Sequence, residues 1–175
     1  PSLPTMVSPE ERRVFQDGDL IRPLDYEGVK LMSFGFVTAP QGGGPAIMRG
    51  PMVSQVINQL LTQTAWGELD YLVLDLPPGT GDIQLSLAQR VPVSAAIIVT
   101  TPQDIALIDA RKALKMFEKV DVPVLGIIEN MSVHQCTNCG HIDPIFGEGG
   151  GARMAEQYGV PLLGKLPLER AIREQ

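Results

Sequence analysis

Two cysteines separated by two residues, Cys136 and Cys139, are side chains whose spacing points to chemistry. Two thiolates at this spacing can hold one metal ion, and Gly140 permits the tight turn that such a loop needs. Zinc sites and [4Fe–4S] clusters usually take four ligands, however, and the chain contains only these 2 cysteines. A complete site would then need two chains, each giving one pair across a two-fold axis.

Other interpretations of the cysteine pair remain open. His134 and His141 flank the pair and could complete a Cys₂His₂ zinc site within one chain, although they stand closer to the cysteines than in the usual finger. A redox motif of the thioredoxin type is expected at a helix N-terminus, whereas this pair lies in a loop after a predicted strand. The pair could also belong to an inert loop.

A second candidate for chemistry is an aspartate that closes a short apolar run. Residues 71–76 contain no polar alternation, which is typical of a strand buried on both faces of a parallel sheet. Asp75 would then lie where such sheets bind ligands and could hold Mg²⁺ through water. Gly79 and Gly81, in the turn that follows, leave backbone N–H groups open to an anion. The alternative is a plain strand-to-helix turn capped by Asp82.

Asn130 and Arg49 are weaker candidates for nucleotide contacts. Asn130 follows a predicted strand, and its amide can donate and accept at an adenine edge, although an ordinary turn asparagine would look the same. Arg49 stands in a glycine-rich stretch, and we interpret it as a solvated loop cation.

Strands and helices alternate from Pro51 onward, which indicates an α/β domain with a doubly wound, mostly parallel sheet. The predicted strands are residues 30–37, 71–76, 94–100, 123–129 and 162–166. The predicted helices begin at residues 51, 82, 101, 152 and 168, and the fourth ends at Gly159. We expect residues 1–175 to form one domain, with an irregular lead-in over 1–29, a flexible loop over 38–50 and a Cys-x-x-Cys loop over 132–150.

Composition narrows the partners and the compartment. The net charge of −6 and the sequence pI near 4.9 argue against a nucleic-acid surface, and no apolar stretch approaches a bilayer span. The start of the chain does not resemble a signal peptide. Two cysteines in one short motif suit a reducing compartment, so we expect a cytoplasmic protein.

Taken together, these motifs resemble the Mrp/ApbC iron–sulfur carrier ATPases, which belong to the deviant-Walker P-loop group with the MinD/ParA and nitrogenase iron-protein ATPases. The resemblance runs through nearly the whole chain in the order of that family. It is carried by Arg49-Gly-Pro-Met52, Asp75-Leu-Pro-Pro-Gly-Thr-Gly-Asp82, Thr100-Thr-Pro-Gln103, Glu129-Asn-Met-Ser132 and Cys136-Thr-Asn-Cys139.

The resemblance implies ATP binding with Mg²⁺, slow hydrolysis, and a labile [4Fe–4S] cluster that bridges a homodimer and passes to apo iron–sulfur proteins. It makes Cys136 and Cys139 the cluster ligands and Asp75 the Walker B acid. Gly79 would sense the γ-phosphate. The remaining residues that it places at the nucleotide are Pro77, Pro78, Asn130 and Pro167.

One part of that family's pattern has no match in these residues. The Gly-Lys-Gly-Gly-Val-Gly-Lys-Ser/Thr loop of the family is absent, and the chain opens at a Pro-Ser that the resemblance places after it. We therefore expect an N-terminally incomplete domain. Phosphoryl transfer depends on positioning and charge stabilisation, so these residues alone are predicted neither to hydrolyse ATP nor to bind it tightly.

Two other functions stay open. A zinc-stapled dimerisation module would use the same cysteine pair with a structural metal. A MinD/ParA-like positioning ATPase would call for a basic patch or a basic amphipathic helix, and neither is visible in the sequence.

Overall fold

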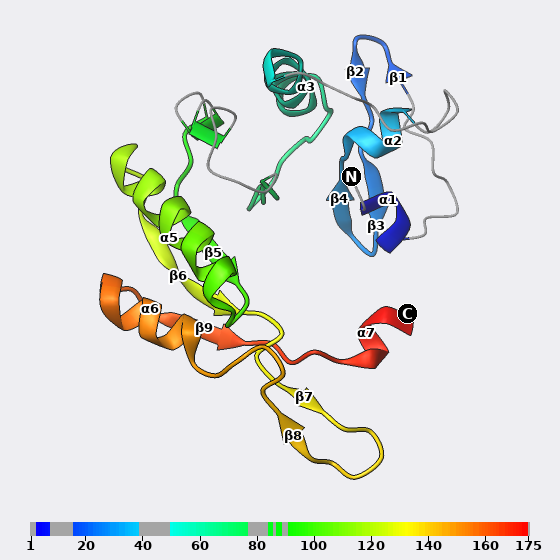
Figure 1. The fold of residues 1–175 in the computed structure, drawn as a ribbon. Coiled ribbons are helices and arrows are strands. Elements are labelled where there is room, and N and C mark those ends of the chain that lie inside the picture. Colours follow the sequence, from blue (N-terminus) through cyan, green and yellow to red (C-terminus); the bar gives the residue numbers. More distant parts are fainter. Residues whose placement is uncertain are drawn as a thin grey trace. The chain divides into compact units, whose positions relative to one another are not determined.

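The computed structural model describes residues 3–7, 16–38, 50–76, 84–85, 87–88 and 91–174 (Figure 1). The chain divides into two compact units, residues 1–75 and 76–175. That all 175 residues form one domain stays a prediction.

The described part of the first unit combines helices with two antiparallel hairpins. Its elements are α1 (Leu3–Met6), β1 (Gln16–Asp17), β2 (Leu20–Ile21), β3 (Leu24–Tyr26), β4 (Val29–Leu31), α2 (Phe34–Thr38) and α3 (Gly50–Thr62). β1 pairs with β2, and β3 pairs with β4. The predicted helix from Pro51 is confirmed as α3, and its C-terminal end is fastened to β2, where the Ile21 amide donates to the Gln63 carbonyl at 2.7 Å.

The hairpins stand where an irregular lead-in was expected. Glu27 and Gly28 both have positive φ, 51° and 80°, which matches the two-residue turns that join twisted antiparallel strands. The Asp25 carboxylate also accepts the Gly28 N–H at 3.2 Å. Local turn chemistry therefore organises a stretch whose apolar residues show no period.

The strand predicted over residues 30–37 is wrong beyond Leu31. Ser33 turns the chain into α2: its carbonyl accepts the Phe36 N–H at 3.0 Å and its Oγ accepts the Gly35 N–H at 3.3 Å. A serine that captures early amides in this way begins a helix, so it ends the extended run. Phe36 is then buried at 1% exposure, which anchors the short helix.

The predicted buried strand over residues 71–76 is also wrong in this structure. The segment belongs to no strand, and Tyr71 and Val73 are each 87% exposed. A parallel strand exists through hydrogen bonds to its neighbours, and none of the described strands pairs with this segment. An apolar run alone does not supply that partner.

The second unit is built on a parallel sheet, as the alternating pattern predicts, and its strands lie in the order β5-β6-β9. Its elements are β5 (Ala96–Thr100), α5 (Asp104–Lys119), β6 (Val124–Glu129), β7 (His134–Gln135), β8 (Ile142–Asp143), α6 (Gly150–Tyr158), β9 (Leu162–Lys165) and α7 (Arg170–Glu174). The register pairs Thr100 with Glu129 and Glu129 with Lys165. The carboxyl ends of the three strands therefore lie together.

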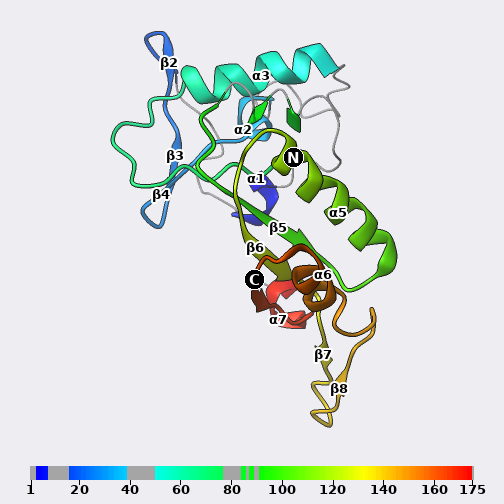
Figure 2. The same cartoon turned by 90° about the vertical axis from the view of Figure 1, so that its left-hand side faces the viewer.

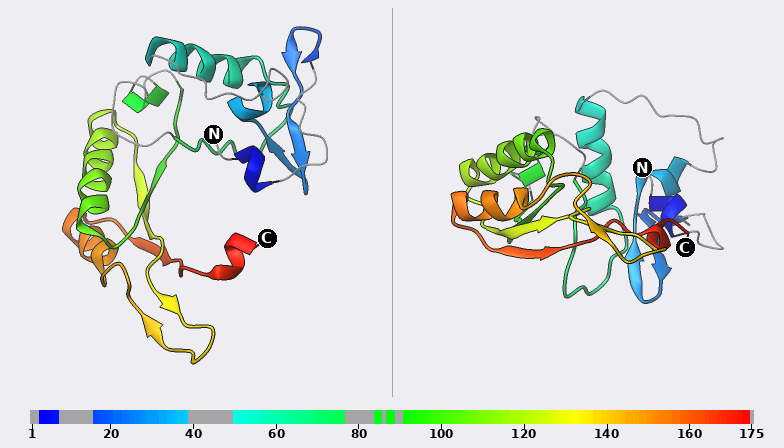
Figure 3. Two further views of the ribbon diagram at one scale, coloured as in Figure 1. Left: turned by 45° about the vertical axis from the view of Figure 1, so that its right-hand side comes forward. Right: turned by 60° about the horizontal axis from the view of Figure 1, so that its bottom comes forward.

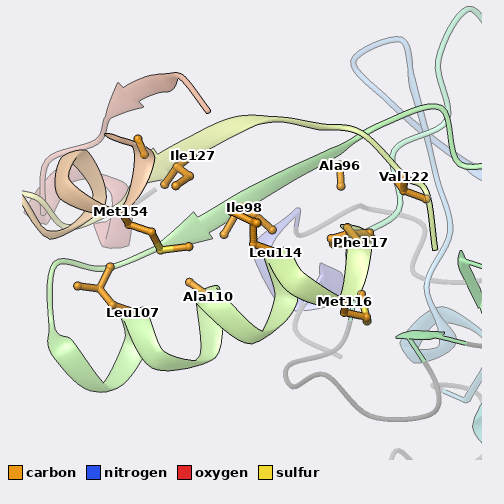
Figure 4. Close-up of a cluster of buried hydrophobic side chains, with 11 residues drawn as sticks. Ala96, Ile98, Leu107, Ala110, Leu114, Met116, Phe117, Val122, Ile127 and Met154 are labelled. Carbon is orange, nitrogen blue, oxygen red and sulfur yellow. The ribbon is translucent and has the colours of Figure 1, made fainter. Parts of the chain in front are cut away.

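The core lies between this sheet and two helices. α5 runs alongside β5 and β6 (Figure 2), and α6 packs on β6 and on α5. Figure 4 shows the buried cluster, in which the inward face of α5 meets Ile98 of β5, with Ile127 of β6 and Met154 of α6 nearby. The inward residues of α5 match the predicted stripe: Leu107, Ala110, Leu114 and Phe117.

Side chains of β5 alternate between buried and exposed, whereas the sequence predicts burial on both faces. Ile97 and Val99 point away from the helices and are exposed, as are Leu125 and Leu163 on the neighbouring strands. Alternation follows from the pleat, because α5 and α6 cover one face of the sheet.

The ends of the helices refine the predicted boundaries. α5 begins at Asp104, and Gln103 occupies the N-cap position that was predicted for Thr101. The Thr101 hydroxyl donates to the Gln103 side-chain oxygen at 3.1 Å. Gly159 ends α6 in the left-handed conformation, as predicted. Of the helix predicted over 82–90, residues 84–85 and 87–88 are helical, and the rest lies outside the described residues, as do residues 39–49. Among the described helices, none has the length and apolar character to cross a bilayer.

We expect Leu114→Ala to lower the free energy of unfolding by about 2–5 kcal/mol, because the leucine is 1% exposed and its loss leaves a cavity. Ile105→Ala is the matched control on the same helix, where the side chain is 72% exposed. Urea unfolding followed by circular dichroism measures both variants. Equal losses in the two would contradict this placement of the core.

Candidate metal centre

The cysteine pair lies at the tip of a small hairpin. β7 and β8 pair antiparallel, His134 with Asp143 and Gln135 with Ile142. Between them the Cys136 amide donates to the His141 carbonyl at 2.8 Å, and the Gly140 amide donates to the Cys136 carbonyl at 2.9 Å. Gly140 has a φ of 72°, a left-handed conformation that favours glycine, as expected for the tight turn of this loop. The hairpin extends beyond the sheet from the carboxyl end of β6 (Figure 3).

Both thiols are free, with Cys136 half-buried and Cys139 exposed. The pKa of the Cys136 thiol is lowered, first by the backbone N–H of Cys139 and then by that of Asn138. A hydrogen bond with the Cys139 side chain also lowers this pKa, burial raises it, and the charge of His134, the last of the causes, lowers it. Because the thiolate is the form that binds metals, the tip is prepared to act as a soft ligand pair.

The two histidines do not complete a site within one chain. The His134 Nδ1 lies 3.0 Å from the Leu168 carbonyl oxygen, and His141 is exposed. Among the described residues, no group of three or more histidine, cysteine or acidic side chains is placed to hold a metal ion. The described part of one chain thus brings together two thiol ligands, which fits half of a four-thiolate site.

Glu129 fixes the base of the loop that carries this hairpin. Its carboxylate is 1% exposed and accepts the Gly151 N–H at 2.5 Å. The Lys165 ammonium lies 3.8 Å from the same carboxylate, and the Glu129 carbonyl accepts the Leu166 N–H at 2.9 Å. The end of β6, the start of α6 and the end of β9 are held together by this one residue.

Sequence reasoning missed the role of Glu129, although two signals pointed to it. A charged residue ends an otherwise apolar strand, and glycines 149–151 stand at the start of the next helix. A Cβ on Gly151 would lie 2.9 Å from Glu129 Oε2, so the glycine lets the carboxylate reach the helix amide.

Asn130 and Pro167, the two candidates for adenine contacts, lie on neighbouring segments at the carboxyl ends of β6 and β9. Asn130 is half-buried, and its backbone N–H donates to the Thr100 carbonyl at 2.7 Å. Its side-chain oxygen accepts the Met131 N–H at 3.0 Å. Pro167 is half-buried between Leu166, which bonds Ser132, and Leu168.

The remaining predicted nucleotide residues belong to the turn after residues 71–76. Asp75 is exposed and lies in a segment that belongs to no strand. Pro77, Pro78 and Gly79 lie outside the described residues, as do Gly81, Asp82 and Arg49. Their roles at a nucleotide therefore stay predictions.

Comparison with known proteins gives consistent matches. The family model "ParA: NUBPL iron-transfer P-loop NTPase" matches residues 1–175. The iron–sulfur cluster carrier protein of Pseudomonas fragi is 60% identical over 153 residues, covering 87% of this chain and 53% of that protein. The protein of the same name from Escherichia coli K12 is 54% identical over 175 residues, covering 99% of this chain and 47% of that protein. The chain thus spans about half the length of these curated relatives.

A solved structure also matches this chain. The nucleotide-binding protein from Archaeoglobus fulgidus, in complex with ADP and with Co found, has a TM-score of 0.82 and 34% identity. The match covers 99% of this chain and 67% of that one. The predicted α/β fold of the P-loop class is confirmed.

We expect Gly151→Ala to cost about 1–3 kcal/mol of stability, because the added methyl group must push the Glu129 carboxylate from its buried hydrogen bond. Gly164→Ala in β9 is the control, since a Cβ there meets nothing within 4 Å. Urea unfolding of both variants tests the contact, and a Gly151→Ala protein as stable as the control would refute it.

Cys136 should alkylate at a lower pH than an ordinary cysteine, because the hydrogen-bonded thiolate is favoured. A Cys139→Ala variant isolates this thiol and keeps the backbone N–H groups of residues 138 and 139. The pH profile of its reaction with iodoacetamide is compared with that of the same variant unfolded in urea. Coincident profiles would show that the folded loop does not stabilise the thiolate.

Proposed function

This chain belongs to the NUBPL iron-transfer P-loop NTPase family, and we propose that it carries an iron–sulfur cluster on Cys136 and Cys139 and delivers it to apo-proteins. Here the cluster is cargo. The observation that carries the proposal is the pair of thiols on one exposed hairpin, with Cys136 already biased toward the thiolate. Thiolates are the ligands that iron–sulfur clusters take, so the donor set suits this cargo.

We propose that the cluster is a [4Fe–4S] cluster shared by two chains. One chain offers two thiols in its described residues, and such clusters usually take four. A two-fold axis at the hairpin tips would complete the set, since a symmetric dimer presents the same surface twice. The exposed position of Cys139 supports this arrangement, because the tip can approach a second copy and later a recipient.

We propose ATP with Mg²⁺ as ligands of the whole protein. Asp75, Pro77, Pro78 and Gly79 would serve the metal and phosphate side, as their place in the resembling motif implies. Asn130 and Pro167 would serve the base, and their positions on adjoining segments support that role. An amide with free donor groups can read an adenine edge. We also propose a cytoplasmic location, because two cysteines in one short motif suit a reducing compartment.

Zinc is the second candidate for the cysteine pair. Backbone N–H groups that support a thiolate suit Zn²⁺ as well as iron, and a zinc-stapled dimer would use the same four sulfurs. The difference between the two functions is lability: a staple keeps its metal, whereas a carrier gives it up to an acceptor.

Anaerobic reconstitution with iron and sulfide should produce a broad visible absorbance, with about one [4Fe–4S] cluster for two chains. Loading should shift the protein from monomer to dimer in size-exclusion chromatography. Cys136→Ala should lose both the colour and the shift, because a single thiolate per chain cannot complete the ligand set.

Thr137→Ala, between the cysteines at an exposed position, is the control and should load normally. Transfer of the cluster to an apo-ferredoxin then separates a carrier from a staple. A colourless protein that instead retains stoichiometric zinc would favour the structural module. If Cys136→Ala loaded as much cluster or zinc as the unmutated chain, both the carrier function and the zinc-staple function of the cysteine pair would be overturned.

A further inference from the structure

The segment after β6 runs beside the segment after β9 and is bonded to it along its length. The Leu166 carbonyl accepts the Ser132 N–H at 2.9 Å and the Ser132 hydroxyl at 3.2 Å. The Leu168 N–H donates to the Val133 carbonyl at 2.8 Å, and His134 pairs with Leu168 as a parallel bridge. We call this strip, residues 132–134 with 166–168, the seam.

The His134 side chain extends the seam into the cysteine hairpin. Its Nδ1 lies 3.0 Å from the Leu168 carbonyl oxygen, and because a carbonyl only accepts, Nδ1 carries the proton. His134 is a residue of β7 and stands two positions before Cys136. The imidazole ring of His134 therefore bonds the segment after β9, while its backbone belongs to the cysteine hairpin.

The hairpin needs this support, because β7 and β8 have two residues each. An isolated two-stranded hairpin is marginally stable at best in water. Most of its side chains are exposed, so a buried face contributes little to its orientation. The seam is accordingly the contact that sets how firmly the tip is held relative to the sheet.

We propose that His134 is a positioning residue that couples the order of the cysteine hairpin to that of Leu166–Leu168. The inference rests on the proposed metal function of Cys136 and Cys139. Metal at the tip orders the hairpin, and an ordered hairpin holds the seam closed. Coupling between two sites is reciprocal, so whatever orders Leu166–Leu168, which includes Pro167, tightens the hold on the metal.

Hydrogen exchange of the seam amides tests the coupling in the full chain, with Co²⁺ as the probe. The Co²⁺–thiolate absorption band reports binding at the tip independently of the seam. On loading, exchange of the Ser132 and Leu168 amides should slow at least about 5-fold, the lower end of common coupling energies. His134→Ala should keep the band and lose the slowing.

His134→Asn retains an N–H donor near the position of Nδ1 and should restore part of the slowing. Gln135→Ala changes the next residue of β7, an exposed one, and should behave like the parent chain. If His134→Ala does not fold, the comparison of the unmutated chain with His134→Asn and Gln135→Ala still tests the coupling.

The outcomes separate the two proposals. A cobalt–thiolate band with unchanged exchange in the parent chain, or equal slowing in parent and His134→Ala, overturns the coupling alone. Absence of the band in the parent chain overturns the metal function and the coupling with it.

Discussion

Glu129 places a nearly inaccessible carboxylate at the carboxyl end of the central strand β6. A buried charge is costly unless it is hydrogen-bonded and paired, and here the Gly151 amide and the Lys165 ammonium supply its partners. Those partners come from the start of α6 and the end of β9. Satisfying one charge therefore fixes three segments, and the cysteine loop leaves and re-enters the fold at this place.

This arrangement gives the cysteine loop a hydrogen-bonded base and an accessible tip. Residues 130–149 span the distance between β6 and α6, and their ends are held by Glu129 and by the bonds of Ser132 to Leu166. The thiols lie at the far end, where Cys139 is exposed. The carrier function that we propose needs both properties, because ligands must be oriented to bind and reachable to release.

Electrostatics at the tip depends on the backbone more than on charged neighbours. The N–H groups of Cys139 and Asn138 are the first causes of the lowered pKa of Cys136, ahead of His134. These groups are supplied by the conformation of the loop itself, which the Gly140 turn makes possible. Substitutions that keep this backbone should therefore preserve the two leading causes of the lowered pKa of Cys136.

Sequence alone determined the features that a local pattern carries: the inward stripe of α5, the alternation of strands and helices that predicts a parallel sheet, and the Cys136–Cys139 spacing. Tertiary structure decided the rest. A strand needs a neighbouring strand to bond, and a buried charge needs a partner that comes from another part of the chain. Residues 71–76 have the composition of a strand but pair with no strand in the described part of the chain. At Ser33 the chain turns into the helix α2, where a strand was predicted. Glu129 and Gly151 are 22 positions apart, and the contact between Leu168 and His134 spans 34, so neither could be inferred from local spacing.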